Sequence, residues 1–260
     1  MSKSIQLKVE NKVAYITFNR PEVFNSFNRE MAFSLQETLD ACEANKDVRA
    51  IVLTGNGKAF CAGQDLKEVT DPDLNPGFKK ILEEHYNPII TRIRSIKKPI
   101  IGAINGVAAG AGANIALACD IVVAHEKVSF IQAFSLIGLV PDSAGTYFLP
   151  RLIGFQKALA LAMLGDKIGA EEAEKMGMIY KCVPTEEFDE TINKLALKLA
   201  NMPTKALGMI KELFNKSMTN DLESQLALES KLQIEAAQSE DYKEGVAAFI
   251  EKRKPNFKGN

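Results

Sequence analysis

Short apolar segments alternate with helical segments through the first half of the sequence. β-Branched runs at residues 5–9 and 13–18 flank a turn and predict a hairpin. Later apolar runs are short and continuous, as in buried parallel strands, and segments with helical spacing lie between them. Further strands are expected at residues 50–54, 99–104 and 121–124, and helices from residue 28, over 88–96 and ending near 118. This alternation predicts an α/β fold.

The remainder of the chain is dominated by helical periodicity. Helices are expected over residues 170–176, 186–200, 203–218 and 222–238. An apolar stripe on the last helix predicts packing against the chain's own core; its members are Leu222, Leu226, Leu228, Leu232 and Ile234. No Gly-, Ser- or Pro-rich linker separates the two parts, so we expect a core of residues 1–200 covered by a helical region of residues 201–260.

Charge and cysteine content narrow the function to small-molecule chemistry. The 32 Lys and Arg residues balance 33 Asp and Glu residues, which leaves no basic surplus for nucleic acid or anionic lipid. The four cysteines lie far apart and only two histidines accompany them, so no metal site is expected. No segment has the apolar length of a membrane span and the N-terminus lacks a leader-like run, so a cytoplasmic location is expected.

Two segments rich in small residues let the backbone approach another group closely. Residues 57–66, Gly-Lys-Ala-Phe-Cys-Ala-Gly-Gln-Asp-Leu, follow a strand and fit either a tight turn or a ligand-binding loop. Residues 105–120 run from a strand into a helix whose first turn is made of Gly and Ala. Free N–H groups at such a helix start suit an oxyanion, a phosphate or close helix packing. The P-loop Lys-Ser/Thr pair and the dinucleotide glycine spacing are both absent.

A third segment, residues 130–151, contains one isolated carboxylate. Asp142 follows a long uncharged run, where desolvation would raise its pKa and make it a proton acceptor near neutral pH. An aspartate before Ser-Ala-Gly-Thr also fits a helix cap. The residues alone leave both interpretations open.

Together, in this order and at these separations, the three segments resemble the crotonase (enoyl-CoA hydratase/isomerase) superfamily. The similarity runs from Val13 to Phe257 and includes Asn19-Arg20-Pro21, residues 60–66, Lys98-Pro99, Asn105-Gly106 and Cys119-Asp120. The resemblance implies a ββα spiral core and a C-terminal helical region used in trimer formation, often in a dimer of trimers. It also implies an acyl-CoA substrate and no separate cofactor, since coenzyme A enters as part of the substrate.

The family resemblance assigns the thioester oxygen to two backbone N–H groups, here those of Gln64 and Ala111. The two glutamates that hydratases use correspond to Asn114 and Phe134, neither of which can activate water as a base. A narrower resemblance, carried by residues 129–135, 138–143 and 147–151, is to family members that isomerise ring-1,2-epoxyphenylacetyl-CoA to oxepin-CoA or shift cis-3 double bonds to trans-2. In these the single catalytic aspartate corresponds to Asp142.

The resemblance also implies a set of substrate-binding positions. CoA phosphates are expected to meet basic side chains, including two near the C-terminus that could serve a neighbouring subunit. The expected binding residues are Arg20, Phe24, Ala62, Gly63, Asp65, Leu66, Lys67, Gly110, Asn114, Phe134, Lys252 and Arg253. A hydratase or general enoyl-CoA isomerase is the alternative function, and an RNA-binding family member is disfavoured by the net charge of -1.

Overall fold

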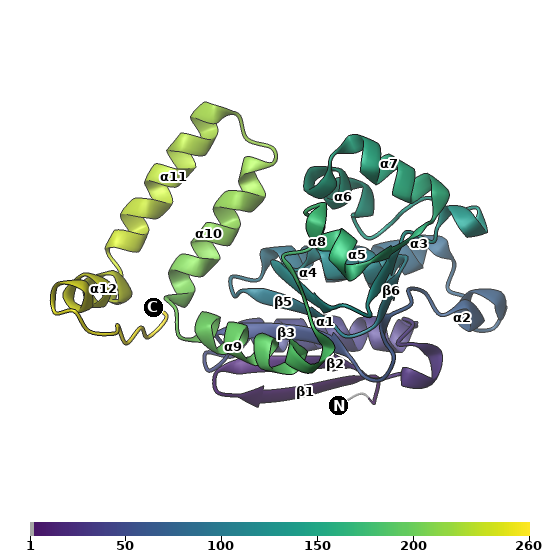
Figure 1. Ribbon diagram of the computed structural model, residues 1–260, viewed down its shortest axis with the longest axis horizontal. Helices are drawn as coiled ribbons and strands as arrows, with labels where there is room; N and C mark the ends of the chain where they lie inside the picture. Colours follow the sequence, from purple (N-terminus) through teal and green to yellow (C-terminus); the bar gives the residue numbers. More distant parts are fainter. Residues whose placement is uncertain (1–2) are drawn as a thin grey trace.

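A six-stranded sheet forms the base of the molecule in the computed structural model, which describes residues 3–260 (Figure 1). Strands β1 (Ile5–Glu10) and β2 (Val13–Phe18) form an antiparallel hairpin. Its two-residue turn places Asn11 and Lys12 at φ +51° and +65°, the left-handed pair that matches strand twist. Strands β3 (Ala50–Gly55), β5 (Ile100–Ile104), β7 (Ile121–His125) and β10 (Lys181–Val183) continue the sheet in parallel. The predicted α/β fold is confirmed.

A second sheet of four short strands lies across from the first. Its order is β4 (Ala59–Cys61), β6 (Val107–Ala109), β8 (Ser129–Ile131) and β9 (Lys167–Gly169). Strands β3, β5 and β7 of the large sheet are each followed at once by a strand of this small sheet, so the chain winds between the two as a spiral. The sequence did not predict this sheet, because three-residue strands of small residues carry no periodic signal and depend on distant partners.

The space between the two sheets holds the main core. Phe18, Phe27 and Phe60 pack there with ring centroids 5.0–5.3 Å apart. Helices α1 (Arg29–Ala44), α4 (Asn87–Ser95) and α5 (Ala111–Ala118) close this core. Helix α5 is buried along its whole length, which its Ala- and Gly-rich sequence permits because little side-chain volume separates it from β4 and β6.

A second apolar layer covers the other face of the large sheet. Alternate residues of the strands point to opposite faces, so Ile51 and Leu53 enter the main core while Val52 meets α9 (Phe188–Ala200). The other helices before residue 201 pack around these layers, and several of them add buried residues to the main core. They are α2 (Leu66–Thr70), α3 (Phe78–Lys80), α6 (Gly145–Ile153), α7 (Phe155–Leu164), α8 (Ala170–Lys175), the π-helix Ile81–Tyr86, and the 3-10 turns Pro21–Val23, Ser135–Ile137 and Thr185–Glu187. Helices α6 and α7 were not predicted.

The last three helices leave the core as an arm, at the left of Figure 1. They are α10 (Thr204–Ser217), α11 (Leu222–Ala237) and α12 (Glu240–Ile250). The prediction that the stripe on α11 packs against the chain's own core is wrong. Leu222, Leu226 and Ile234 are 75%, 52% and 62% exposed, and only Leu232 of the stripe is buried. The helical period of these residues shows that they form one apolar face of α11. The period alone does not show whether that face packs against the same chain or against another one.

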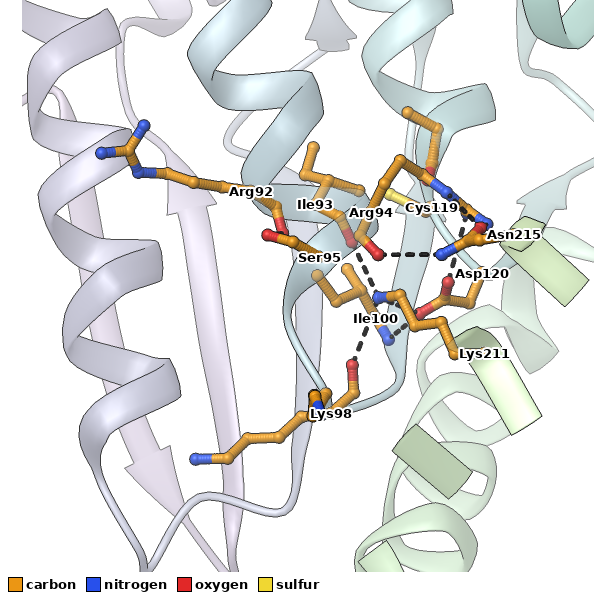
Figure 2. Close-up of polar contacts among 12 residues, drawn as sticks. Arg92, Ile93, Arg94, Ser95, Lys98, Ile100, Cys119, Asp120, Lys211 and Asn215 are labelled. Carbon is orange, nitrogen blue, oxygen red and sulfur yellow. Dashed lines mark hydrogen bonds and ion pairs between the residues drawn. The ribbon is translucent and has the colours of Figure 1, made fainter. Parts of the chain in front are cut away.

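A buried polar cluster fastens α10 to the core (Figure 2). The Lys211 ammonium donates to the carbonyl of Ile93 at 2.7 Å and pairs with Asp120 Oδ2 at 2.8 Å. Asp120 Oδ1 in turn pairs with Arg94 at 3.2 Å, and Arg94 also contacts the Asn215 side chain. One carboxylate at the start of β7 thus joins α4 and α10.

Candidate active site

The first predicted loop approaches the second closely at Gly63, where only a residue without a side chain fits. Gly63 takes φ +96°, and a Cβ there would lie 3.1 Å from the carbonyl oxygen of Ala109 and 3.5 Å from the nitrogen of Ala111. A side chain at this position would therefore push apart the two segments that carry the predicted donors. The structure brings the Gly63-Gln64 peptide and the start of α5 together, although they are separated by almost fifty residues.

The backbone of Gln64 is orientated by its neighbours. Phe27 N–H donates to the Gly63 carbonyl at 2.7 Å, and Asp65 N–H donates to the Phe27 carbonyl at 2.8 Å. In this parallel bridge the N–H of the middle residue, Gln64, points away from Phe27. Arg20 also fixes the loop through an ion pair with Asp65 at 2.9 Å.

The second donor stands at the N-terminus of α5. Gly110 precedes the helix at φ +52° and ψ −127°, and its own N–H is bonded to the Ile131 carbonyl. Ala111 then supplies the first helical N–H, where the helix dipole favours negative charge. Gly112 must lack a side chain, because its Cβ would lie 2.2 Å from the Cys61 carbonyl oxygen. The arrangement suits an oxygen that gains negative charge during a reaction.

The side chain of Gln64 is tied down by residues that the sequence did not single out. Tyr86 donates its hydroxyl to Gln64 Oε1 at 2.9 Å, and Gln64 Nε2 donates to Glu68 Oε2 at 2.7 Å. Burial raises the pKa of Tyr86 well above its usual value, so the phenol remains a donor. Gln64 and Glu68 are four residues apart, so their contact could have been suspected from the sequence. Tyr86 lies in the π-helix, and only tertiary packing places it next to Gln64.

The predicted acid/base residue lies in a turn just before α6. Burial raises the pKa of Asp142 above the usual aspartate value, and a hydrogen bond from the Ser143 hydroxyl at 2.8 Å opposes that rise. The carboxylate does not cap α6, because the N-cap residue is Ala144 and this helix has no side-chain capping hydrogen bond. The helix-cap alternative for Asp142 is therefore wrong.

The positions that correspond to the two hydratase glutamates are both filled without a carboxylate. Asn114 is 1% exposed, donates Nδ2 to the Asp142 carbonyl at 2.9 Å and accepts a hydrogen bond from Gln132 Nε2 at 2.8 Å. The Phe134 ring is buried, and its Cζ atom lies 3.8 Å from where a Cβ on Gly110 would be. Asn114 thus holds the backbone of Asp142, and Phe134 places an apolar ring beside Gly110, just before the N-terminus of α5.

The other expected binding residues fall into two groups. Phe24, Ala62, Leu66 and Lys67 lie on or beside the first loop, and Phe24 and Leu66 are 52% and 61% exposed. Lys252 and Arg253 follow α12, which Figure 1 shows at the opposite end of the molecule from α2. Arg253 is also engaged by Glu244 and Glu251. One chain alone does not bring Lys252 and Arg253 to the site.

Within residues 3–260, no three His, Cys, Asp or Glu side chains are grouped as metal ligands would be. Over the same residues, no helix has the length and apolarity needed to cross a bilayer.

Comparison with known proteins gives the family. The family model described as enoyl-CoA hydratase/isomerase matches residues 8–260. The 1,2-epoxyphenylacetyl-CoA isomerase of Escherichia coli is 46% identical over 261 residues, with 100% of both chains covered. A probable enoyl-CoA hydratase of Rhodobacter capsulatus is 45% identical over 256 residues, with 98% of both chains covered. The crystal structure of a putative enoyl-CoA hydratase/isomerase from Mycobacterium abscessus has a TM-score of 0.92 at 36% identity and covers 98% of this chain and 100% of that one.

These relatives carry the names of two different reactions at nearly equal identity, so the comparison establishes the family and leaves the reaction to the site. The match to the family extends over nearly the whole chain, and it agrees with the two-sheet spiral and its C-terminal helices. The chain therefore belongs to the enoyl-CoA hydratase/isomerase family, the crotonases, and is an enzyme that acts on CoA thioesters.

Proposed function

We propose that the enzyme isomerises its acyl-CoA substrate and does not hydrate it. The observation that carries this proposal is the pair of positions 114 and 134. Asn114 has both polar side-chain atoms engaged inside the protein, and Phe134 has no group that exchanges a proton. Hydration by this family's route uses two carboxylates to position and deprotonate water, whereas moving a proton between two carbons needs only one.

In the proposed mechanism, the backbone N–H groups of Gln64 and Ala111 bind the thioester carbonyl oxygen. Asp142 removes a proton from the carbon next to the carbonyl, and the two N–H groups stabilise the resulting enolate. The protonated Asp142 then returns the proton at a different carbon, so the substrate and product contain the same atoms. The raised pKa of Asp142 suits both steps, because it strengthens the carboxylate as a base and retains the proton until it is delivered.

Two substrates fit this proposal. The first is ring-1,2-epoxyphenylacetyl-CoA, converted to oxepin-CoA, and the E. coli relative named for isomerising 1,2-epoxyphenylacetyl-CoA supports it. Here the bond between the two epoxide carbons breaks as the ring double bonds shift, which gives the seven-membered ring, and the proton taken from the carbon next to the carbonyl is returned to a ring carbon. The second is a cis-3-enoyl-CoA converted to the trans-2 isomer by the same proton transfer. The alternative is an enoyl-CoA hydratase, which the name of the Rhodobacter relative favours.

Three parallel assays separate these functions. Purified enzyme is given crotonyl-CoA to test hydration, a cis-3-enoyl-CoA to test double-bond migration, and the ring epoxide to test oxepin formation. We expect turnover of the second or third substrate and little of the first. Asp142→Asn should lower isomerisation about 100- to 10,000-fold, the usual contribution of a general acid/base. Asp73→Asn, a change in the exposed loop after α2, is the matched control. Hydration that exceeds isomerisation, or near-parental turnover by Asp142→Asn, would contradict the proposal.

We also propose that the chain works as a homotrimer or a dimer of trimers, with residues 201–260 as the region of contact. Two sets of large apolar side chains support this, one on the arm and one on the core. The arm exposes Phe214, Leu222, Ile234, Phe249 and Ile250, and the core exposes Leu136, Ile137, Val140, Phe155, Met163 and Leu164. Surfaces of this kind on a folded chain mark interaction sites. Association would also let Lys252 and Arg253 reach a CoA phosphate in a neighbouring subunit, since these residues follow α12, which lies at the opposite end of the molecule from the first loop and α2.

A further inference from the structure

A row of hydrogen bonds leads from a buried glutamine to the turn that carries Asp142. Gln132 Nε2 donates to Asn114 Oδ1 at 2.8 Å, and Asn114 Nδ2 donates to the Asp142 carbonyl oxygen at 2.9 Å. Both amides are almost fully enclosed, Gln132 being 4% and Asn114 1% exposed. We call Gln132 and Asn114 the amide relay. Gln132 was not among the residues expected in the site.

The orientation of both amides follows from the carbonyl at the end of the row. A backbone carbonyl can only accept, so Asn114 must turn its Nδ2 toward Asp142 and its Oδ1 toward Gln132. Gln132 must then present Nε2 to Asn114, which leaves its own Oε1 as an acceptor. Among residues 3–260, nothing donates to this buried oxygen. The two hydrogen bonds of the relay therefore fix which end of each amide faces the other, and the donor end of Gln132 faces Asn114.

The turn at the other end of the relay is strained and fitted around Asn114. Ser143 and Ala144 take φ +51° and +59°, which residues with side chains seldom adopt. A Cβ on Gly145 would lie 2.3 Å from Asn114 Nδ2, so the relay reaches Asp142 only because position 145 is glycine. The Asp142 carbonyl also accepts the Gly145 N–H at 2.9 Å. The relay therefore supplies one of two hydrogen bonds that fix this carbonyl in place.

We propose that Gln132 is a positioning residue for catalysis, which acts through Asn114 to hold Asp142 in line with the substrate carbon. This inference rests on the proposed function, since it assigns the relay to the same aspartate. The relay fixes the backbone of Asp142 while its carboxylate stays free to accept and return a proton. It also gives a role to the residue that stands at a hydratase glutamate position, because Asn114 can donate to the Asp142 carbonyl and a carboxylate cannot.

The first test is Gln132→Leu, which keeps the side-chain volume and removes the donor. We expect kcat to fall about 10- to 100-fold, the effect of a displacement near 1 Å on a reacting group, with KM within about twofold of the parental value. Amide hydrogen exchange at Gly145 should become faster, since its hydrogen bond to Asp142 is part of the same turn. Asn193→Leu is the control, because Asn193 is also an amide, and its Oδ1 accepts a hydrogen bond from the Tyr15 hydroxyl at 3.2 Å on the other face of the large sheet. It should leave kcat and the exchange at Gly145 unchanged.

A second variant asks whether the donated proton, and not the volume, is what matters. Gln132→Glu can donate to Asn114 Oδ1 only while the introduced carboxyl is protonated. We expect the ratio of its kcat to that of Gln132→Leu to rise as the pH falls. A ratio that does not change with pH would contradict the requirement for a donor at position 132.

The outcomes separate the relay from the reaction it serves. Parental kcat in Gln132→Leu combined with an inactive Asp142→Asn would overturn the relay and leave the isomerase proposal standing. Unchanged exchange at Gly145 in Gln132→Leu would also overturn the relay, whichever substrate is used. Parental turnover in Asp142→Asn would overturn the proposed function, and the catalytic role of Gln132 with it.

Discussion

At the scale of single residues, the candidate site depends on one carboxylate in a turn that the surrounding structure holds in a strained shape. The two left-handed residues after Asp142 cost about 1–3 kcal/mol each, and such strain persists only where neighbouring contacts fix the backbone. Burial raises the pKa of the Asp142 carboxyl, so the same packing that holds the turn also makes the group a stronger base. A strained turn directly after a carboxylate with a raised pKa is a combination expected at a catalytic site.

The shifted pKa predicts opposite effects of Asp142 on activity and stability. The catalytic base is lost as the pH falls through the raised pKa, so kcat/KM should decline on the acid side at a pH above the usual aspartate range. The folded chain binds this proton more tightly than the unfolded chain. Asp142 therefore lowers stability as the pH rises from the ordinary aspartate pKa through the raised pKa of the folded chain.

Asp142→Asn should accordingly be less active and more stable than the parental enzyme at neutral pH. Urea denaturation at pH 7 and at pH 4 measures the second effect. The stability advantage of the variant should shrink at the lower pH, and an advantage that is equal at both pH values would contradict the burial argument.

A second prediction at this scale concerns the donor that holds Gln64. Tyr86→Phe removes the hydroxyl that donates to Gln64 Oε1 and should lower kcat/KM about fivefold, from the loss of about 1 kcal/mol of positioning. Tyr15→Phe is the control, since that hydroxyl bonds Asn193 at 3.2 Å outside the main core. Steady-state kinetics with the preferred substrate measures both. Equal effects of the two variants would show that the Tyr86 hydroxyl has no specific role.

At the scale of elements, the candidate site is formed by a short loop and one helix N-terminus, and neighbouring elements hold both in position. The proposed oxyanion-binding groups come from a four-residue loop after β4 and from the first turn of α5, and neither holds its geometry alone. The parallel bridge to Phe27 fixes the first, and the packing of Gly112 on Cys61 fixes the second. The π-helix Ile81–Tyr86 then places one tyrosine against the loop, in keeping with the frequent occurrence of π-turns at functional sites.

The contact between α10 and the core also depends on one side chain. Lys211→Met should destabilise the folded chain by about 3 kcal/mol, because Asp120 would lose one partner of a buried ion pair while keeping Arg94 and the Ile100 N–H. Chemical denaturation measures the change, and hydrogen exchange in α10 should report it locally. Lys216→Met, on the exposed side of the same helix, is the control. Equal stability of the two variants would show that the cluster in Figure 2 does not fasten the arm.

At the scale of the whole molecule, the arm presents an apolar surface that one chain does not cover. Figure 1 shows α11 and α12 standing clear of the core. Phe249, Ile250 and Leu222 are 85%, 72% and 75% exposed. Leaving this much apolar area in water is unfavourable by roughly 25 cal/mol for each Å² that a partner could bury.

Phe249→Asp should therefore weaken self-association. The expected result is a shift from the trimer or hexamer toward the monomer in sedimentation velocity, because a carboxylate would have to be desolvated in the interface. Phe249→Leu keeps the position apolar and should leave the sedimentation profile nearly unchanged. If Phe249→Asp sediments like the parental chain, α12 is not part of the interface.

The sequence by itself determined the larger elements and pointed to the family. Strands β3, β5 and β7 and the four helices expected after residue 165 are read from periodicity, which is a local property, and their bounds agree with the structure to within about two residues. The parallel strand β10 was not predicted. The resemblance of three segments to crotonases implied the family, which the comparisons confirm. The roles of Gln64, Ala111 and Asp142 remain predictions.

The tertiary structure decided what depends on contacts between distant residues. The four strands of the small sheet form only against one another, and the stripe on α11 proved to be exposed because no part of its own core reaches it. Tyr86, Gln132 and Gly145 joined the site for the same reason. Each matters through a hydrogen bond or a close approach to a residue at least eighteen positions away, and no local pattern encodes such a contact.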